Sequence, residues 1–253
     1  MSAAAGLVRR AGAALLLGAA LVLGGCATLP PASDGPGLLT QKDPFERFNR
    51  HMFAFNEGVD TVAIKPAALI YQNVVPQVLR TGVDNFLGNL GDAWTTVNLF
   101  LQAKPAQGLN MGLRTAVNTV FGFGGLLDIA DEAGLERTSV EDLGQTLGRW
   151  GVKSGPYLVL PFLGPSTLRD GAGLVLDIRD SGPALVFKEP QDRYGATGIQ
   201  LLNTRVKLLN AGRVLDDIAL DKYVLMRDAY LARRRSLIYD GDPPEDENPP
   251  SDK

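Results

Sequence analysis

The sequence predicts a mainly α-helical protein. Helix-start signals recur along the chain, and apolar residues repeat at three- and four-residue spacing. No clean alternation of apolar and polar residues runs longer than about five residues, so strands are expected to be few. The best strand candidate is the short segment 157–160. With 253 residues, the chain is long enough for one domain that buries its own core.

The predicted helices follow one another between residues 43 and 235. The first begins with Asp43 as N-cap, Pro44 at the first helical position and Glu46 at the third. Later helices are expected over residues 76–100, from residue 105 onward, over 193–209 and over 214–235. Glycines at 82, 88 and 91 are candidate breaks in the second helix. Capping boxes are expected at residues 138–141 and 167–170.

Three stretches of the predicted domain carry no charged residue: 93–103, 115–127 and 154–168. Uncharged runs of about 10–14 residues are typical of core helices or of re-entrant and interfacial segments, rather than of membrane spans. Prolines at 156, 161 and 165 exclude a regular helix from the third stretch. The second stretch is rich in glycine. It is either a plain core loop or an apolar hairpin that dips into lipid, and the residues alone leave both open.

The first 25 residues predict a lipoprotein signal peptide. Arg9 and Arg10 precede fifteen uncharged residues rich in Leu, Ala and Gly, a length typical of the apolar region of a signal peptide. Leu23-Gly24-Gly25 then lead to Cys26, the only cysteine, and resemble a bacterial lipobox. The alternative is an ordinary cleavage site with an incidental cysteine. On the lipobox interpretation Cys26 carries diacylglycerol and an acylated amino group, which anchor the protein stably in a membrane. No other cofactor is expected.

Charge is unevenly distributed along the chain. The net charge of −3 becomes −5 when the signal peptide, with two arginines and no acid, is removed. Residues 240–253 hold six acids and one lysine, so this Pro-rich tail carries all of that charge and is expected to be disordered. We therefore predict a signal peptide at 1–25, a flexible tether at 26–42, a single helical domain at 43–239 and an acidic tail at 240–253. The neutral domain gives no reason to expect nucleic acid as a partner.

The sequence holds no recognisable catalytic or metal-binding constellation. One cysteine and one histidine exclude a Cys/His zinc site. His51 lies within the first predicted helix, and neither a Gly-x-Ser-x-Gly elbow nor a Walker Gly-Lys-Ser/Thr motif is present. The sequence thus predicts a protein that is not an enzyme but binds, anchors or conducts. A lipid-acting hydrolase that depends on His51 is a minor alternative.

The chain resembles the VacJ (MlaA) family of lipoproteins through motifs that occur in order over most of the mature domain. The most specific block is EDLGQTLGRWGV at residues 141–152. The other blocks are DPFERFNR at 43–50, FAFN at 53–56, NFLGNL at 85–90, RTAVNT at 114–119, GFGGLLD at 122–128, GPY at 155–157 and LPFLGPSTLRD at 160–170. The long tether, the segment lengths between residues 177 and 193 and the acidic tail depart from the family pattern.

This resemblance implies an outer-membrane lipoprotein that helps to maintain lipid asymmetry. Such a protein removes mislocalised phospholipid from the outer leaflet, passes it to a periplasmic lipid-carrier protein and associates with trimeric porins. The implied fold is a helical ring in the inner leaflet of the outer-membrane bilayer, with a central amphipathic channel and a helical hairpin. Ala27, where an inner-membrane lipoprotein usually has Asp, agrees with this location. A structural adaptor that only tethers a porin or another envelope complex is the alternative.

On this interpretation the uncharged stretches face lipid, and two segments are candidate lipid-handling sites. Residues 115–127 are expected to form the hairpin, with glycines giving it bend. Residues 45–56 are expected to line or close the inner-leaflet side of the channel. The candidate residues are Phe45, Phe48, Phe55, Asn56, Phe121, Gly122, Phe123, Gly124, Gly125 and Leu126.

Overall fold

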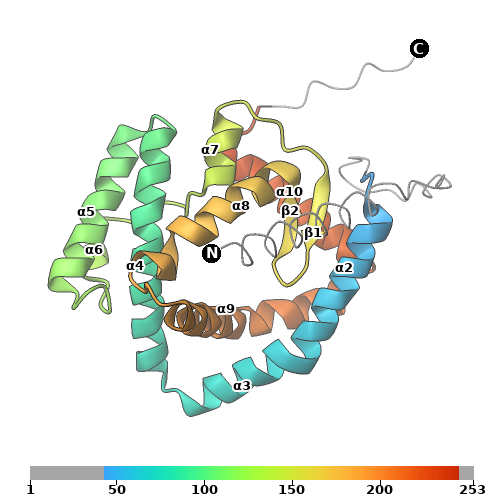
Figure 1. The fold of residues 1–253 in the computed structure, drawn as a ribbon, viewed down its shortest axis with the longest axis horizontal. Helices are drawn as coiled ribbons and strands as arrows, with labels where there is room; N and C mark the ends of the chain where they lie inside the picture. Colours follow the sequence, from blue (N-terminus) through green and yellow to red (C-terminus); the bar gives the residue numbers. More distant parts are fainter. Residues whose placement is uncertain (1–42, 245–253) are drawn as a thin grey trace, which may run out of the picture. The chain divides into compact units, whose positions relative to one another are not determined.

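A computed structural model describes residues 43–244, apart from the side chains of residues 217 and 218. The predicted signal peptide, the tether and the tail beyond Pro244 lie outside the described residues. The described part is mainly helical, as predicted (Figure 1). Its helices are α2 (Glu46–Val59), α3 (Lys65–Val74), α4 (Gln77–Leu101), α5 (Pro105–Phe121), α6 (Ile129–Glu132), α7 (Leu143–Arg149), α8 (Leu168–Asp180), α9 (Pro190–Ile218) and α10 (Lys222–Ile238), with a π-helical turn η1 (Asp60–Ile64) and a 3₁₀ turn η2 (Gly182–Leu185).

Helix starts follow local capping chemistry, with two differences from the prediction. Thr167 caps α8 as expected, since its hydroxyl accepts a hydrogen bond from the amide of Asp170 at 3.2 Å. The box predicted at 138–141 does not cap a helix. Instead Asp142 caps α7, accepting from the amide of Gln145 at 2.8 Å. Helix α2 begins two residues later than predicted, at Glu46.

Two long helices continue past positions at which a break was expected. Helix α4 is continuous over 25 residues, because Gly82 and Gly88 lie against the side chains of Leu126 and Arg137 and allow close approach there. Helix α9 continues to Ile218, and the break before α10 falls at residues 219–221 rather than 210–213. In α4, packing against neighbouring elements outweighs the weak helix propensity of glycine.

The strand predicted at residues 157–160 is confirmed as β1 (Tyr157–Leu160), and its partner β2 (Gly164–Thr167) was not predicted. The two strands are antiparallel, with Tyr157 opposite Thr167 and Leu160 opposite Gly164. Phe162 at the tip of the hairpin has φ +63° and Gly164 has φ +81°. The prolines that exclude a helix from this stretch therefore accompany a tight β-hairpin.

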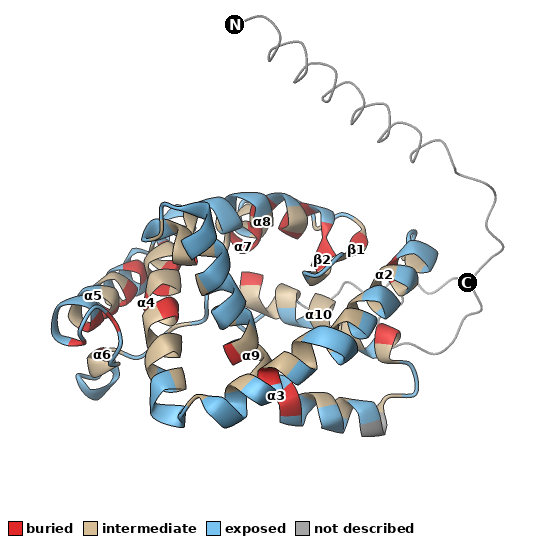
Figure 2. Ribbon diagram, turned by 60° about the horizontal axis from the view of Figure 1, so that its bottom comes forward, coloured by how far each residue is buried: buried red, intermediate tan, exposed pale blue. Residues whose placement is uncertain are grey.

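In Figure 1 the elements follow one another around the middle of the view. The continuous run of α2, η1 and α3 leads to α4. On the side of the view opposite α3 lie α7, α8, α10 and the hairpin. Strand β1 of the hairpin contacts α2. Helix α9 packs on α3 and α4, and α5 packs on the outer side of α4. Figure 2 shows buried residues scattered along several helices rather than gathered in one large core. None of the described helices combines the length and the apolar character needed to cross a membrane.

Candidate functional site

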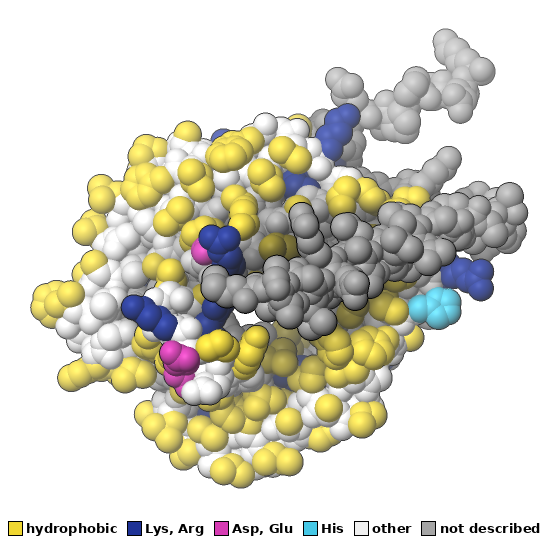
Figure 3. Space-filling model, in the orientation of Figure 1, with side chains coloured by type: hydrophobic (Ala, Val, Ile, Leu, Met, Phe, Trp, Pro, Cys, Tyr) yellow, Lys and Arg dark blue, Asp and Glu magenta, His cyan; other side chains and the backbone are white. Residues whose placement is uncertain are grey.

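The side chains of this domain have an inverted distribution of polarity. Asn49, Asn98 and Thr146 have no exposed surface, while Phe123 and Tyr194 are 76 % and 77 % exposed. Soluble domains usually bury large apolar residues and expose polar ones. Figure 3 shows hydrophobic side chains spread over much of the visible face, with few charged ones between them. Exposed apolar surface of this extent marks a site of contact with a membrane or with another protein.

Helix α5 shows the inversion most clearly. Its single charged residue, Arg114, is buried and contacts Asp128 and, at 2.5 Å, the carbonyl oxygen of Leu135. The exposed positions of the helix are uncharged, and the large apolar ones among them are Leu109, Leu113, Val120 and Phe121. The helix therefore places its charge inside the domain and its apolar side chains outside.

A buried polar network connects α4, α5 and the segment that follows α5. The carboxylate of Asp92 accepts hydrogen bonds from Arg137 at 2.7 and 2.9 Å, and Arg114 lies 3.8 Å from it. Burial raises the pKa of Asp92 in spite of these two cations. Asn118 donates to Asp128 at 3.0 Å and accepts from the amide of Ala130 at 2.9 Å. These contacts fix the base of the loop at residues 122–128.

Two asparagines, Asn49 and Asn56, two turns apart on α2, bind the free edge of β1 and the tip of the hairpin; we call this contact the α2–hairpin junction. The amide of Asn49 donates to the carbonyl oxygen of Tyr157 at 3.0 Å and accepts from the amide of Val159 at 2.9 Å. Asn56 donates to the carbonyl oxygen of Leu160 at 2.9 Å and accepts from the amide of Phe162 at 2.8 Å. The two side chains thus supply the hydrogen bonds that a third strand would otherwise supply.

Aromatic and acidic side chains complete the α2–hairpin junction. The rings of Phe55 and Phe162 meet edge to face, with centroids 5.2 Å apart. At the other end of α2, the carboxylate of Asp43 accepts from the side chain of Asn49 at 3.0 Å and from the hydroxyl of Tyr223. Burial, together with Asp43, raises the pKa of the Tyr223 hydroxyl, which therefore stays a donor.

A second ionic cluster joins α7, α8 and α10. Arg234 contacts Asp142 at 2.5 Å and Asp170 at 3.0 Å, and the hydroxyl of Tyr230 donates to Asp170 at 2.9 Å. Burial alone would raise the pKa of both carboxyls, but Arg234 holds the pKa of each below its usual value. The cluster is a structural connection between three helices.

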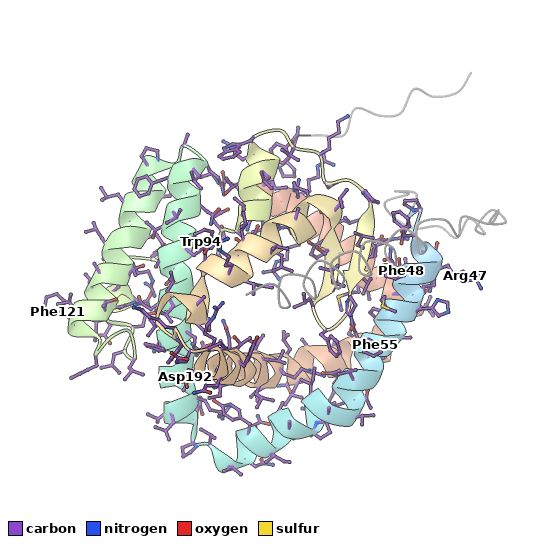
Figure 4. The ribbon with its side chains drawn as sticks, viewed as in Figure 1. Arg47, Phe48, Phe55, Trp94, Phe121 and Asp192 are labelled. Carbon is purple, nitrogen blue, oxygen red and sulfur yellow. The ribbon has the colours of Figure 1, made fainter. Side chains whose placement is uncertain are left out.

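The candidate residues on α2 lie on one side of the helix. Phe48 and Phe55 lie on the side that faces the middle of the view, and Arg47 on the other (Figure 4). Phe45, Phe48 and Phe55 are all exposed, and Asn56 belongs to the α2–hairpin junction. The structure thus brings Phe55 and Asn56 together with the β-hairpin, a contact that sequence spacing could not reveal.

The second candidate segment, residues 115–127, is the last half of α5 followed by a loop. It is not itself a hairpin; the helical hairpin is the α4–α5 pair, whose turn lies at residues 102–104. Phe121 points away from the middle of the view (Figure 4). The glycines have steric roles: a Cβ on Gly122 would lie 2.3 Å from the carbonyl oxygen of Leu127, and Gly124 and Gly125 have φ +76° and +97°. Whether they also act as a hinge stays a prediction.

His51 has the geometry of a helix-surface residue. It is exposed, and its Nδ1 lies 2.5 Å from the carbonyl oxygen of Arg47 in the preceding turn. Among residues 43–244 no group of three or more His, Cys, Asp or Glu side chains is placed to hold a metal ion. Sequence reasoning missed Asn49, Arg114 and Arg234, because a buried polar residue has no pattern of its own in one sequence.

Comparison with known proteins gives consistent matches over this domain. The family model described as MlaA lipoprotein matches residues 41–237. Intermembrane phospholipid transport system lipoproteins MlaA from Shigella flexneri and Escherichia coli K12 are each 38 % identical over 222 residues, covering 86 % of this chain and 87 % of theirs. The Haemophilus influenzae protein of the same name is 31 % identical over 219 residues, 86 % of each chain. A solved structure described as "Structural basis for maintenance of bacterial outer membrane lipid asymmetry" matches with TM-score 0.70 and 35 % identity, over 78 % of this chain and all of the other.

Proposed function

The chain belongs to the MlaA lipoprotein family, and from this membership we infer that it acts in intermembrane phospholipid transport and the maintenance of outer-membrane lipid asymmetry. More specifically, we propose that it removes mislocalised phospholipid from the outer leaflet and passes it to a periplasmic carrier protein. Cys26, with its acyl and diacylglycerol groups, anchors the chain in the outer membrane, and a trimeric porin is its partner there.

The observation that carries this proposal is the inverted polarity of the domain. An apolar exterior and a polar interior suit a protein that lies within one leaflet and guides a lipid headgroup past the hydrocarbon. Arg114 of α5 and Asp92 of α4 are buried and paired, so the outer surface of α5 can meet acyl chains without desolvating an ion.

A lipid path through such a domain needs no catalytic group. The headgroup requires polar side chains along its route, and the tails require continuous contact with apolar surface. We propose that the run of α2, η1, α3, α4, α8 and the hairpin forms a ring around an amphipathic channel, and that the tails stay in contact with its apolar rim. Movement then follows the differences in lipid free energy between the sites that the channel connects, without covalent chemistry.

The α2–hairpin junction closes this ring in the proposal. Residues 49 and 157, and residues 56 and 160, are more than a hundred positions apart in the chain, and side-chain amides of α2 hydrogen-bond to the backbone of the hairpin there. We therefore propose that Phe45, Phe48, Phe55 and Asn56 line or close the inner-leaflet side of the channel. Loss of Asn56 would leave the amide of Phe162 and the carbonyl oxygen of Leu160 without their hydrogen-bond partners on α2 and loosen the tip of the hairpin.

The test is mass spectrometry of the phospholipid that remains with the full, acylated protein after purification in mild detergent. We expect stoichiometric diacyl phospholipid with the wild type. We expect a changed amount in Asn56→Ala, together with more phospholipid in the outer leaflet of cells. Asn110→Ala is the matched control. The side-chain amide of Asn110 also donates to a backbone carbonyl oxygen, that of Glu136 at 3.1 Å, but both residues are far from α2 in the chain.

Wild-type protein that carries no lipid beyond its own anchor would contradict the channel. The remaining candidate would then be a structural adaptor tethered to a porin or another envelope complex. Equal lipid content and equal outer-leaflet phospholipid in Asn56→Ala and Asn110→Ala would remove the α2–hairpin junction from the lipid path, while leaving the transport proposal intact.

A further inference from the structure

We propose that the end of α7 and the segment after it form a binding site for the phosphate of an anionic phospholipid headgroup. The site, here called the α7 corner, consists of Phe100, Leu101, Arg149, Trp150, Val152 and Lys153. The inference deepens the proposed function, and it rests on that function only in taking a phospholipid bilayer as the place where the domain works.

The α7 corner joins exposed apolar side chains to exposed cations through a tryptophan. Trp150 is 57 % exposed, and its indole Nε1 donates to the carbonyl oxygen of Leu101 at 2.9 Å, which ties it to the end of α4. Phe100 and Leu101 at that end are exposed apolar residues. Arg149 and Lys153, before and after Trp150 in the chain, are exposed as well. Tryptophan with apolar residues on one side and cations on the other is typical of surfaces at the level of lipid headgroups.

The two cations of the α7 corner have no acidic partner among the described residues. Within residues 43–244, neither Arg149 nor Lys153 makes an ion pair or a side-chain hydrogen bond. Asp142, the acid that caps α7, is already bound by Arg234. The macrodipole of α7 favours a cation in its last turn and so accounts for Arg149, but Lys153 lies beyond the end of the helix. The pair therefore offers positive charge to an anion.

The backbone that carries Lys153 is held on both sides. The amide of Val152 donates to the carbonyl oxygen of Leu147 at 2.9 Å, and the carbonyl oxygen of Val152 accepts from the side chain of Arg169 at 3.3 Å. The carbonyl oxygen of Ser154 accepts from the amide of Arg169 at 3.1 Å. Binding of a headgroup would therefore order only the cationic side chains and not the backbone, which lowers its entropic cost.

The α7 corner is separate from the two candidate lipid-handling segments. Leu101 ends α4 just before the turn into α5, whereas the loop at residues 122–128 follows the other end of α5. A helix of 17 residues is about 25 Å long, so the two ends of α5 are well apart. Figure 1 shows α7 beside the end of α4 that leads into this turn. The α2–hairpin junction is built from other elements.

A phospholipid is the ligand that fits both parts of the α7 corner. A free phosphate or an acidic peptide would use the cations but would leave Trp150, Phe100 and Val152 exposed to water. A phospholipid brings its phosphate to the cations and its acyl chains to the apolar side chains. A net anionic headgroup is favoured over a zwitterionic one, which carries a cation of its own. The acidic tail is the rival occupant within the chain, and the test includes it.

The test identifies the lipid beside Trp150 in vesicles of phosphatidylcholine and phosphatidylglycerol that contain the full, acylated protein. One of the two lipids at a time carries brominated acyl chains, which quench tryptophan fluorescence on contact. Trp94→Phe leaves Trp150 as the only tryptophan. We expect phosphatidylglycerol to be preferred beside Trp150 by about fivefold or more, since one cation near an anionic surface contributes about this factor. High salt should reduce the preference, because the cations are exposed.

The charge on the α7 corner is then removed and compared with a matched change. Arg149→Gln together with Lys153→Gln should bring the preference to about one. The control is Arg47→Gln together with Lys188→Gln, which removes the same charge from exposed cations on other elements and should leave the preference unchanged. If Trp94→Phe does not fold, subtracting the quenching in Trp150→Phe from that in the wild type gives the same quantity.

No preference at Trp150, or an equal preference in the two double variants, would overturn the inference. A preference that arises only after residues 245–253 are removed would overturn it too, since the acidic tail would then occupy the α7 corner. So would fluorescence that neither brominated lipid quenches, because water or protein would then cover Trp150.

Phospholipid carried by the purified wild type is measured in parallel, so that the two proposals can be separated. Lipid-carrying protein without a preference at Trp150 contradicts this inference alone. A preference at Trp150 in protein that carries no lipid beyond its own anchor contradicts the transport proposal alone.

Discussion

At the scale of single residues, Asn49 has the largest structural role that the sequence did not reveal. Its side chain is completely buried and joins Asp43, Tyr157 and Val159. Two of these contacts satisfy backbone groups of β1, and a buried backbone group without a partner costs about 1–3 kcal/mol. Asn49 therefore determines whether α2 can hold the edge of the hairpin.

Replacing Asn49 by alanine should lower the free energy of unfolding by about 2–5 kcal/mol, because it leaves the amide of Val159 and the carbonyl oxygen of Tyr157 unpaired. Urea unfolding in mild detergent, followed by circular dichroism, measures the change. The control is His51→Ala on the exposed side of the same helix, which should alter neither stability nor phospholipid transport. A variant at position 49 as stable as the one at 51 would contradict the role assigned to Asn49.

Asp142 gives the domain a predictable pH dependence. Burial opposes its charge, but Arg234 lowers the pKa of the folded carboxyl below its ordinary value of 3.8. The stabilisation is therefore complete above that ordinary value and is lost as the pH falls through the lowered pKa of the folded state. Burial raises the pKa of Glu141 and Asp177, and these two groups act in the opposite direction.

Asp142→Asn isolates this contribution, because Asn is an equally good N-cap for α7 and only the charge is removed. At pH 7 the variant should be less stable than the wild type by about 3 kcal/mol, as expected when one partner of a partly buried ion pair is lost. The difference should shrink to nothing as the pH falls through the lowered pKa. Thermal midpoints of both proteins between pH 7 and pH 2 measure this, and a difference that does not change with pH would contradict the pairing.

At the scale of secondary-structure elements, two similar Thr-x-x-acid patterns have different outcomes. Thr167 caps α8, whereas Thr138 makes only a 3.4 Å contact with the carbonyl oxygen of Ser139. The difference arises after Thr138, where the side chain of Glu141 is taken into a buried contact with Gln102 at 2.9 Å. A tertiary contact thus removes the acid on which the predicted box depended.

Thr167→Ala should therefore lower stability by about 1–2 kcal/mol, through loss of the hydrogen bond to the first turn of α8. Thr138→Ala is the matched control and should stay within about 0.5 kcal/mol of the wild type. Chemical unfolding of the two variants under the same detergent conditions gives the comparison. Equal losses at both positions would mean that the box at 138–141 does cap a helix.

The elements that could be predicted are those whose conformation is determined by residues close to one another in the sequence. The strand at 157–160 and the helix from residue 105 were both found from patterns within a few residues. The helix predicted over 76–100 is confirmed as α4, but the sequence could not show that its candidate glycine breaks are absent, because packing against Arg137, which is distant in the chain, supports Gly88. For the candidate site, the sequence identified Phe55 and Asn56 but not the hairpin that they contact, since more than a hundred residues separate the partners.

At the scale of the whole molecule, the distribution of polarity determines how the protein behaves in water. The described domain exposes large apolar side chains from α2 to α10, and its small buried apolar cluster is built around Tyr157, Val159 and Tyr223. Neutral net charge over residues 26–239 adds little colloidal repulsion. The mean hydropathy of the chain, +0.02, conceals this arrangement, because it averages buried and exposed residues together.

The domain should therefore stay with membranes even without the lipid anchor that we propose at Cys26. If an ordinary cleavable signal peptide replaces residues 1–25 and Cys26→Ala removes acylation, we expect the chain to sediment with membranes, resist alkaline carbonate and require detergent, because its exposed apolar side chains would otherwise be in water. Changing Leu109, Leu113 and Val120 to glutamine in the same chain should release part of it, since these residues form the outward side of α5. The wild-type protein is the control for full retention. An unacylated chain that is a lipid-free monomer in buffer would show that anchoring depends on Cys26 alone and that the apolar surface is covered in another way.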